Sequence, residues 1–248
     1  MILVDIGNTN VHFAQGFDTK ISKNKFTRTC EINKAKLKKI LSSYRDDKVL
    51  ACSVVPAITK LFKGLKKSSA KKIYIAGEDF KVPIKSFYDK SSIGMDRLVC
   101  AFAAKTIYPH TRLVIDFGTA VTFDFISRKG DYEGGFILPG VGSTLRVLSS
   151  CALLPKQDIF KKERKPVSKV KIPRNTPSSI KRGIEDGFSA MVNSLVAKYS
   201  RALGISAKET IVITGGDFSL IQPYLTFRYA FDPFLVIRGL LILGREYL

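Results

Sequence analysis

The chain has 248 residues, of which 45% are hydrophobic and 25% charged, as in a soluble globular protein of one or two domains. Its most apolar run, residues 234–243, contains Arg238 and spans only about ten residues, too few to cross a bilayer. Residues 1–5 lack the basic segment that begins a signal peptide. These features argue against a membrane-spanning or fibrous protein and predict a cytoplasmic one without a membrane partner.

The net charge of +20 is compatible with anionic partners, including nucleic acid. Lysines cluster in residues 60–72, with helical spacing, and in residues 156–174, where prolines indicate a loop. No helix-turn-helix or RNA-binding aromatic signature accompanies them. We interpret both runs as solvated faces and do not expect specific nucleic-acid binding, although a basic nucleic-acid-binding regulator stays open as an alternative function.

Three apolar residues followed by Asp, an apolar residue and Gly occur twice, in residues 2–9 and 113–120. The two aspartates, Asp5 and Asp116, are 111 positions apart, a separation that fits one lobe of a duplicated α/β structure. A strand-like run follows each copy, so each predicts a β-hairpin. Backbone N–H groups in such glycine-containing turns can bind phosphate oxygens.

The remaining pattern alternates helices with strands, which predicts mixed or parallel sheets flanked by helices. A third strand, residues 211–213, ends in Thr214-Gly215-Gly216, where glycines would let a flat ligand approach the backbone. Helical periodicity covers residues 31–44, 96–106, 178–203 and 218–224, and short strands are expected at 51–55 and 73–75.

Four aspartates stand where phosphoryl transfer would need carboxylates to hold metal ions or to accept a proton. Asp5 and Asp116 lie at strand ends beside the glycine turns, and Asp96 follows Gly94 at the start of a predicted helix. Asp124 ends a neighbouring strand, where it either caps that strand or has a metal-linked role.

The two D-x-G hairpins and the T-G-G strand end together resemble the phosphate 1, phosphate 2 and adenosine motifs of the actin/Hsp70/sugar-kinase superfamily. The resemblance implies two duplicated ribonuclease H-like lobes with an ATP cleft between them. The expected lobes are residues 1–112 plus 232–248, and residues 113–231.

Within that superfamily the sequence resembles the type III pantothenate kinases over essentially its whole length. The motifs that carry this resemblance are Asp5–Asn10, Gly94–Arg97, Asp116–Ala120, Gly134–Gly140 and Thr214–Gly216. It implies ATP-dependent phosphorylation of pantothenate to 4′-phosphopantothenate, the first step of coenzyme A biosynthesis, by a homodimer.

The resemblance also implies roles for individual residues. Asp96 would be the proton acceptor, Asp5 would hold the Mg²⁺ of ATP through water, and Asp116 would bind a monovalent cation, K⁺ or NH₄⁺. ATP is assigned to Asp5, Ile6, Gly7, Asn8, Thr9, Asn10, Val11, His12, Gly118, Thr119, Gly215 and Gly216. Pantothenate is assigned to Tyr88, Gly94, Met95, Asp96, Arg97 and Thr176.

The sequence departs from the family pattern at two places, and it leaves alternatives open at others. His12 stands where the family often has Lys, and residues 89–93 lack the proline that the family tends to place before its G-x-D-R turn. Arg97 suits an acceptor that bears a carboxylate as well as a hydroxyl, but it could be an ordinary helix-surface cation. The glycines of Gly134–Gly140 could be turn punctuation alone. A related kinase acting on another hydroxy acid or a sugar is the alternative activity.

Overall fold

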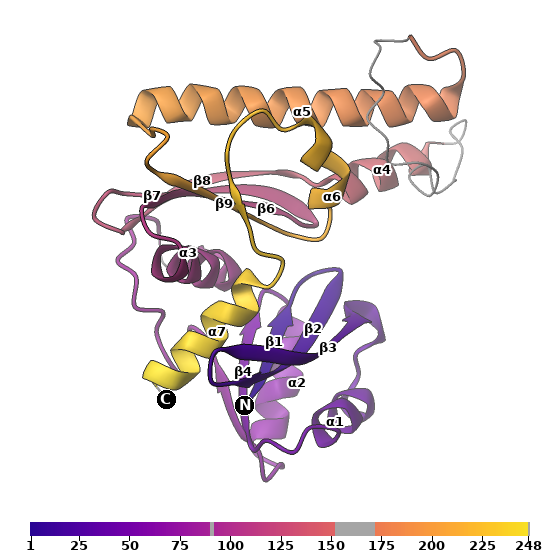
Figure 1. The fold of residues 1–248 in the computed structure, drawn as a ribbon. Helices are drawn as coiled ribbons and strands as arrows, with labels where there is room; N and C mark the ends of the chain where they lie inside the picture. The colour runs from indigo at the N-terminus through magenta and orange to yellow at the C-terminus, as the bar shows by residue number, and fades with distance from the viewer. Residues whose placement is uncertain (90–91, 152–171, 248) are drawn as a thin grey trace. The chain divides into compact units, whose positions relative to one another are not determined.

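The computed structural model describes residues 1–89, 92–151 and 172–247, which form an α/β fold with two five-stranded sheets (Figure 1). No helix within these ranges is long and apolar enough to cross a membrane. The strands are β1 (Ile2–Ile6), β2 (Asn10–Phe17), β3 (Lys20–Arg28), β4 (Lys48–Ser53), β5 (Lys72–Ile75), β6 (Thr111–Phe117), β7 (Ala120–Ile126), β8 (Tyr132–Pro139), β9 (Thr210–Thr214) and β10 (Ala230–Phe231). The α-helices are α1 (Lys34–Ser42), α2 (Pro56–Lys66), α3 (Met95–Ile107), α4 (Val141–Ser150), α5 (Thr176–Leu203), α6 (Phe218–Ile221) and α7 (Leu235–Glu246).

The chain divides into two compact units. The first comprises residues 1–109, 124–134 and 234–248, and the second comprises residues 110–123 and 135–233. The lobe boundaries expected from the sequence stay a prediction.

The first sheet has the strand order β3-β2-β1-β4-β5. Its central strand β1 is antiparallel to β2 and parallel to β4, so that Asp5 pairs with His12 on one side and with Cys52 on the other. The β1 sequence ILVDI is buried except at Asp5, which is partly exposed. A continuous apolar run is what a strand covered on both faces requires. Asp5 is therefore a carboxylate near the end of an otherwise apolar, buried strand.

The helices of the first unit begin at recognisable signals. The side chain of Asn33 accepts a hydrogen bond from Lys36 N (2.9 Å) and so caps α1, and Pro56 occupies the first turn of α2. Helix α7 packs against α3, β1 and β4. A Cβ at Gly239 would lie 2.7 Å from Val99 Cγ1, so the glycine allows α7 and α3 to come close.

The second sheet has the strand order β10-β9-β6-β7-β8. β6 runs parallel to β9 with Asp116 opposite Thr214, which brings the second D-x-G turn beside the T-G-G strand end. Helix α5, the long orange helix of Figure 1, is capped at its N-terminus by Asn175, whose side chain accepts from Ser178 N at 3.0 Å. It ends at Gly204, which takes the left-handed conformation (φ 61°) that commonly terminates a helix.

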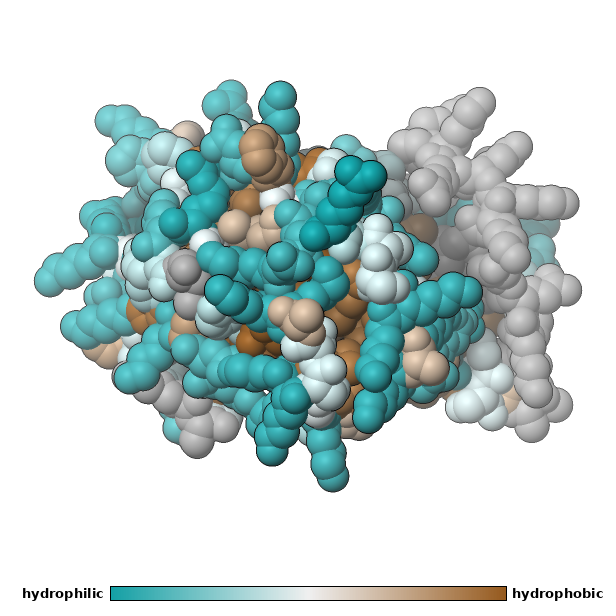
Figure 2. Space-filling view, turned by 90° about the horizontal axis from the view of Figure 1, so that it is seen from below, coloured by the Kyte–Doolittle hydropathy of each residue, from teal (hydrophilic) through white to brown (hydrophobic). Residues whose placement is uncertain are grey.

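Three features differ from the sequence expectations. Strand β3 was not foreseen, because most of its side chains are exposed and it lacks alternating burial. The glycines of residues 134–140 are more than turn punctuation, since they lie within β8 and at the start of α4. Of the two basic runs, residues 156–171 lie outside the described residues, whereas Lys60, Lys63, Lys66 and Lys67 are exposed as expected. Figure 2 shows one face of the molecule covered largely by long hydrophilic side chains.

Candidate functional site

The first glycine turn joins β1 to β2 and is fixed by backbone bonds. Gly7 N donates to Asn10 O (3.0 Å), and Thr29 Oγ1 donates to Gly7 O (2.6 Å). The side chains from Asn8 to Asn10 are exposed. The turn is thus held rigidly while its outer edge faces solvent, as a phosphate-binding turn requires.

Two carboxylates and a thiol, those of Asp5, Asp96 and Cys52, interact electrostatically near the end of β1. Burial, with the charge of Asp96 adding to it, raises the pKa of Asp5 to about 7. Burial also raises the pKa of Asp96, against the hydrogen bond that its Oδ1 accepts from Arg97 N (2.8 Å). Burial, with the charges of both carboxylates adding to it, raises the pKa of the Cys52 thiol. Two partly desolvated carboxylates in one place favour a bound cation or a shared proton.

Helix α3 begins in a way that places the Asp96 carboxylate at its N-terminus. Gly94 precedes the first turn, and a Cβ there would lie 2.6 Å from Asp96 Oδ1, so only glycine leaves the carboxylate this space. Gly77 supports the same turn from outside. It has a positive φ (83°), and a Cβ on it would lie 2.3 Å from Met95 Cε.

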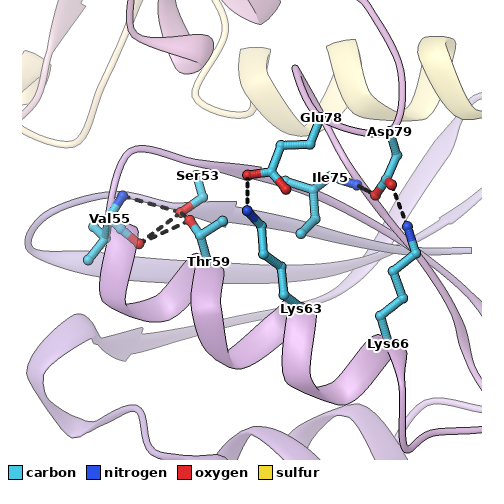
Figure 3. A network of polar contacts seen from close by, with 8 residues as sticks. All are labelled: Ser53, Val55, Thr59, Lys63, Lys66, Ile75, Glu78 and Asp79. Carbon is cyan, nitrogen blue, oxygen red and sulfur yellow. Dashed lines mark hydrogen bonds and ion pairs between the residues drawn. The ribbon is translucent and has the colours of Figure 1, made fainter.

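Polar contacts to α2 hold the loop that contains Gly77 (Figure 3). Lys63 pairs with Glu78 (2.7 Å), and Lys66 pairs with Asp79. Asp79 also accepts a hydrogen bond from Ile75 N (2.8 Å). The loop that contains Gly77 and packs on Met95 is therefore held against α2 by these ion pairs.

At the other end of α2, Thr59 Oγ1 donates to Ser53 Oγ (2.7 Å) and Ser53 Oγ accepts from Val55 N (3.2 Å), as Figure 3 shows. These bonds join the end of β4 to the first turns of α2. Since β4 is paired with β1, they stabilise the strand end beside Asp5.

Arg97, which follows Asp96 in the first turn of α3, lies in a buried polar cluster. Its Nε donates to Asp124 Oδ1 (2.8 Å), and Tyr132 Oη donates to the same oxygen (2.6 Å). The guanidinium carbon lies 5.5 Å from the centre of the Tyr88 ring and 5.9 Å from that of Tyr132. With the Arg97 side chain only 6% exposed, the interpretation of this residue as a surface cation is wrong.

The charges of this cluster are mutually stabilising. Burial alone would lower the pKa of Arg97, but the charge of Asp124 and their hydrogen bond outweigh it and raise the pKa. Burial and the charge of Asp124 raise the pKa of the Tyr132 phenol. The cluster thus contains one cation, one anion and a neutral hydroxyl. Neither role that the sequence suggested for Asp124, strand cap or metal ligand, includes this partnership with Arg97.

His12 is a buried packing residue in this structure. Its ring stacks on Phe26 (centroids 4.0 Å apart), lies tilted against Phe234, and places Nε2 3.1 Å from Asn24 Oδ1. Burial lowers its pKa despite the bond with Asn24. An imidazole held neutral contributes no positive charge to an anion, so any phosphate contact by His12 would be a neutral one.

In the second unit three glycine motifs meet at one turn. Gly215, with φ 98°, passes so close to β6 that a Cβ would lie 2.4 Å from both Asp116 Oδ1 and Phe117 C. A Cβ on Gly140 would lie 2.2 Å from Gly118 O, and Gly140 N donates to Thr119 O (3.0 Å). The motifs containing Asp116, Gly140 and Gly215 are therefore packed backbone to backbone, at distances that only glycine permits.

Thr176, assigned to pantothenate by resemblance, also belongs to the second unit. It is exposed in the first turn of α5. It lines a shallow hollow between α4 and α5 together with Thr144, Leu148, Arg174, Asn175, Ser179, Ile180, Gly183 and Ile184.

The described residues do not form a cluster of side chains that could ligate a metal ion directly. Across residues 1–89, 92–151 and 172–247, no three His, Cys, Asp or Glu side chains gather as a metal site. The carboxylates of Asp5 and Asp96 nevertheless fit a divalent ion approached through water, because Mg²⁺ usually keeps several of its waters. Sequence reasoning missed Cys52 and Tyr132 in these surroundings, since a Cys among apolar residues and a Tyr after a turn give no local signal of function.

Known proteins are similar to this chain in sequence and in fold. The family model for type III pantothenate kinase matches residues 1–198. The type III pantothenate kinase of Sulfurihydrogenibium sp. is 34% identical over 99% of both chains, and that of Persephonella marina is 34% identical over 97% of this chain and 96% of its own.

Two solved structures show the fold at lower identity. A putative Baf family transcriptional activator from Campylobacter jejuni aligns over 100% of both chains with a TM-score of 0.62 and 21% identity. Component A of the (R)-2-hydroxyglutaryl-CoA dehydratase of Acidaminococcus fermentans covers 97% of this chain and 94% of its own, with a TM-score of 0.56 and 15% identity.

The predicted α/β class, with mixed sheets flanked by helices, is confirmed by these neighbours and by the two five-stranded sheets. The motifs at Asp5, Gly94–Arg97, Asp116 and Gly215 lie in a chain that the family model and full-length relatives both match. The chain belongs to the type III pantothenate kinase family.

Proposed function

We propose that this protein transfers the γ-phosphoryl group of ATP to the primary hydroxyl of pantothenate, which gives 4′-phosphopantothenate for coenzyme A biosynthesis. The observation that supports this most directly is the start of α3, where a carboxylate and a guanidinium occupy consecutive positions. Pantothenate bears a hydroxyl at one end and a carboxylate at the other, so its phosphorylation calls for a base and a cation at separate places.

Asp96 and Arg97 meet this requirement because neighbouring residues of a helix do not face the same direction. The Asp96 carboxylate lies near that of Asp5, whose pKa its charge raises. The Arg97 guanidinium is bonded to Asp124 and lies close to the rings of Tyr88 and Tyr132. One side chain can accept the proton of the hydroxyl while the other binds the carboxylate.

Asp96 suits the role of proton acceptor. Burial moves its pKa upward and makes it a stronger base than a solvated aspartate, while the hydrogen bond from Arg97 N fixes one of its oxygens. A positioned base contributes about 10²–10⁴-fold to the rate of such a transfer.

The phosphates of ATP would be held by the turns at Asp5–His12 and Gly118–Thr119, with Gly215 and Gly216 at the adenosine. Mg²⁺ bound with ATP would neutralise phosphate charge, and Asp5 would orient it through water. We further propose that Asp116 binds a monovalent cation, that Tyr88 and Thr176 contact pantothenate, and that the enzyme acts as a homodimer in the cytoplasm.

Initial rates with ATP, Mg²⁺ and K⁺ over a panel of acceptors test the proposal. The panel contains pantothenate, the analogue with its carboxylate reduced to an alcohol, a short hydroxy acid and a hexose. Pantothenate is expected to have the highest kcat/KM. The alcohol analogue is expected to have a lower kcat/KM, mainly because its KM is higher, since Arg97 has no anion to bind. A hexose or short acid that outperforms pantothenate would overturn the proposal.

A further inference from the structure

The buried cluster around Arg97 is organised by a residue that has no assigned role. Tyr132 is completely buried, and its hydroxyl donates to Asp124 Oδ1 at 2.6 Å. Asp124, 1% exposed, uses the same oxygen to accept from Arg97 Nε. Tyr132 and Arg97 therefore hold the carboxylate from two sides, and the carboxylate in turn fixes the guanidinium.

Asp124 engages only one edge of the guanidinium. Besides the bond from Nε, it lies 2.7 Å from Arg97 Nη2, yet that nitrogen is buried and not aligned for a hydrogen bond with any described residue. The edge formed by the two Nη atoms, which Asp124 does not occupy, presents two parallel N–H donors that can pair with a carboxylate in a bidentate manner. Arg97 Nη2 is ion-paired with Asp124 but makes no aligned hydrogen bond, and an acceptor carboxylate would supply one.

The backbone of Tyr132 fixes the second aromatic wall of the cluster. Its N donates to Lys85 O (2.8 Å), and its O accepts from Phe87 N (3.0 Å). These bonds hold the segment that ends at Tyr88, whose ring meets that of Tyr132 edge to face with centroids 6.2 Å apart. Tyr132 thus holds the segment of Tyr88 through its main chain, and it fixes the orientation of Arg97 through its side chain and Asp124.

Gly134 gives the Tyr88 ring its space. It has φ 111°, and a Cβ on it would lie 3.1 Å from Tyr88 Cδ2. A side chain there would be strained and would push against the ring. The first glycine of the G-G-x-I-x-P-G motif thereby contributes to the same cluster.

We infer that Tyr132, acting through Asp124, is a positioning residue that sets Arg97 and Tyr88 for the carboxylate end of the acceptor. This inference rests on the proposed function, since it gives the acceptor site its specificity for an anion. Tyr132 itself is a buried residue behind that site and does not contact the acceptor.

A double-mutant cycle tests whether Tyr132 acts through Arg97. Tyr132→Phe keeps the ring and the backbone pairing and removes only the hydroxyl. It should raise KM for pantothenate about 3- to 10-fold, less than the full value of a bond to a charged group because the bond acts on the acceptor only through Arg97, and leave kcat and KM for ATP within about 2-fold. In an Arg97→Gln background the same substitution should change KM for pantothenate by less than about 2-fold.

Tyr44→Phe is the matched control. Tyr44 is also buried in the first unit, and its hydroxyl donates to Lys23 O (3.1 Å), so the variant loses a tyrosine hydroxyl and its hydrogen bond elsewhere. It should leave both KM values unchanged. Asp124→Asn provides a second variant, because it keeps the shape of the carboxylate and removes its charge; it should raise KM for pantothenate more than Tyr132→Phe does.

The side-chain ¹⁵N–¹H signal of Arg97 Nε supplies a readout that needs no substrate. Tyr132→Phe should shift this signal and speed its exchange with water, whereas Tyr44→Phe should not. Full additivity in the cycle, equal rises in both KM values, or an Nε signal that Tyr132→Phe leaves unchanged would overturn the inference. If the wild-type protein does not phosphorylate pantothenate, the proposed function is wrong, and the Nε signal still decides whether Tyr132 holds Arg97.

Discussion

Replacing Asp5 by Asn should make the folded protein more stable at neutral and alkaline pH while it impairs catalysis. Burial with the charge of Asp96 raises the pKa of Asp5 to about 7 from its ordinary value of 3.8. The folded state then binds a proton more tightly than the unfolded state. Stability is therefore lost as pH rises from about 4 to about 7, and the loss is complete above the folded pKa.

The size of the effect follows from that shift. At about 1.4 kcal/mol for each pH unit, a shift from 3.8 to about 7 corresponds to at most about 4 kcal/mol. Since Asp5 is partly exposed, solvent screens some of this energy, and we expect about 2–4 kcal/mol. Asn removes the charge and keeps the shape, so the variant should gain this amount above pH 7 and very little at pH 4.

The assay is urea unfolding from pH 4 to pH 8.5 with EDTA and without nucleotide, so that no bound cation compensates the charge. Asp79→Asn is the control with the opposite sign. Desolvation alone would raise the pKa of Asp79, but its bonds with Lys66 and Ile75 N outweigh this and lower the pKa, so its charge stabilises the fold at neutral pH. Equal stability of Asp5→Asn and wild type at pH 8, or a difference independent of pH, would refute the reasoning.

Three further outcomes are expected. Asp96→Asn should lower kcat about 10²–10⁴-fold with KM for ATP unchanged; steady-state kinetics that show a similar loss of ATP affinity would make Asp96 a nucleotide-site residue. Activity should depend on K⁺ or NH₄⁺ and weaken in Asp116→Asn, which rates in sodium-only buffer measure; full activity there would contradict a cation site. Gly239→Ala should lower the free energy of unfolding by about 1–3 kcal/mol, because the added Cβ would collide with Val99. Gly64→Ala, whose Cβ would lie in open space on α2, should cause no such loss, and urea unfolding midpoints of the two variants test this.

Sequence reasoning reached the parts of the fold that local patterns determine. The apolar run of β1 followed by Asp5 and Gly7 predicted a hairpin, and β1 and β2 form one. The T-G-G segment was expected at a strand end, and β9 places Gly215 against Asp116. Each of these features depends on residues that adjoin in sequence or on the geometry that glycine alone permits.

The Arg97 cluster could not be predicted in this way. Arg97 and Asp124 are 27 positions apart, and their pairing depends on how α3 and β7 come together. The exposed edge strand β3 could not be predicted for a different reason. Its lysine-rich sequence does not alternate between apolar and polar residues. Local pattern thus predicts Asp96 and Arg97 as site residues, while their surroundings depend on tertiary packing.

Identification of the product formed from ATP and pantothenate tests the central claim most directly. The purified protein, with Mg²⁺ and K⁺, should convert pantothenate to a compound heavier by one phosphoryl group, with ADP formed in equal amount and ³¹P spectra placing the phosphate on the primary hydroxyl. ADP release without a phosphorylated acceptor, phosphate at another position, or no reaction would contradict the account.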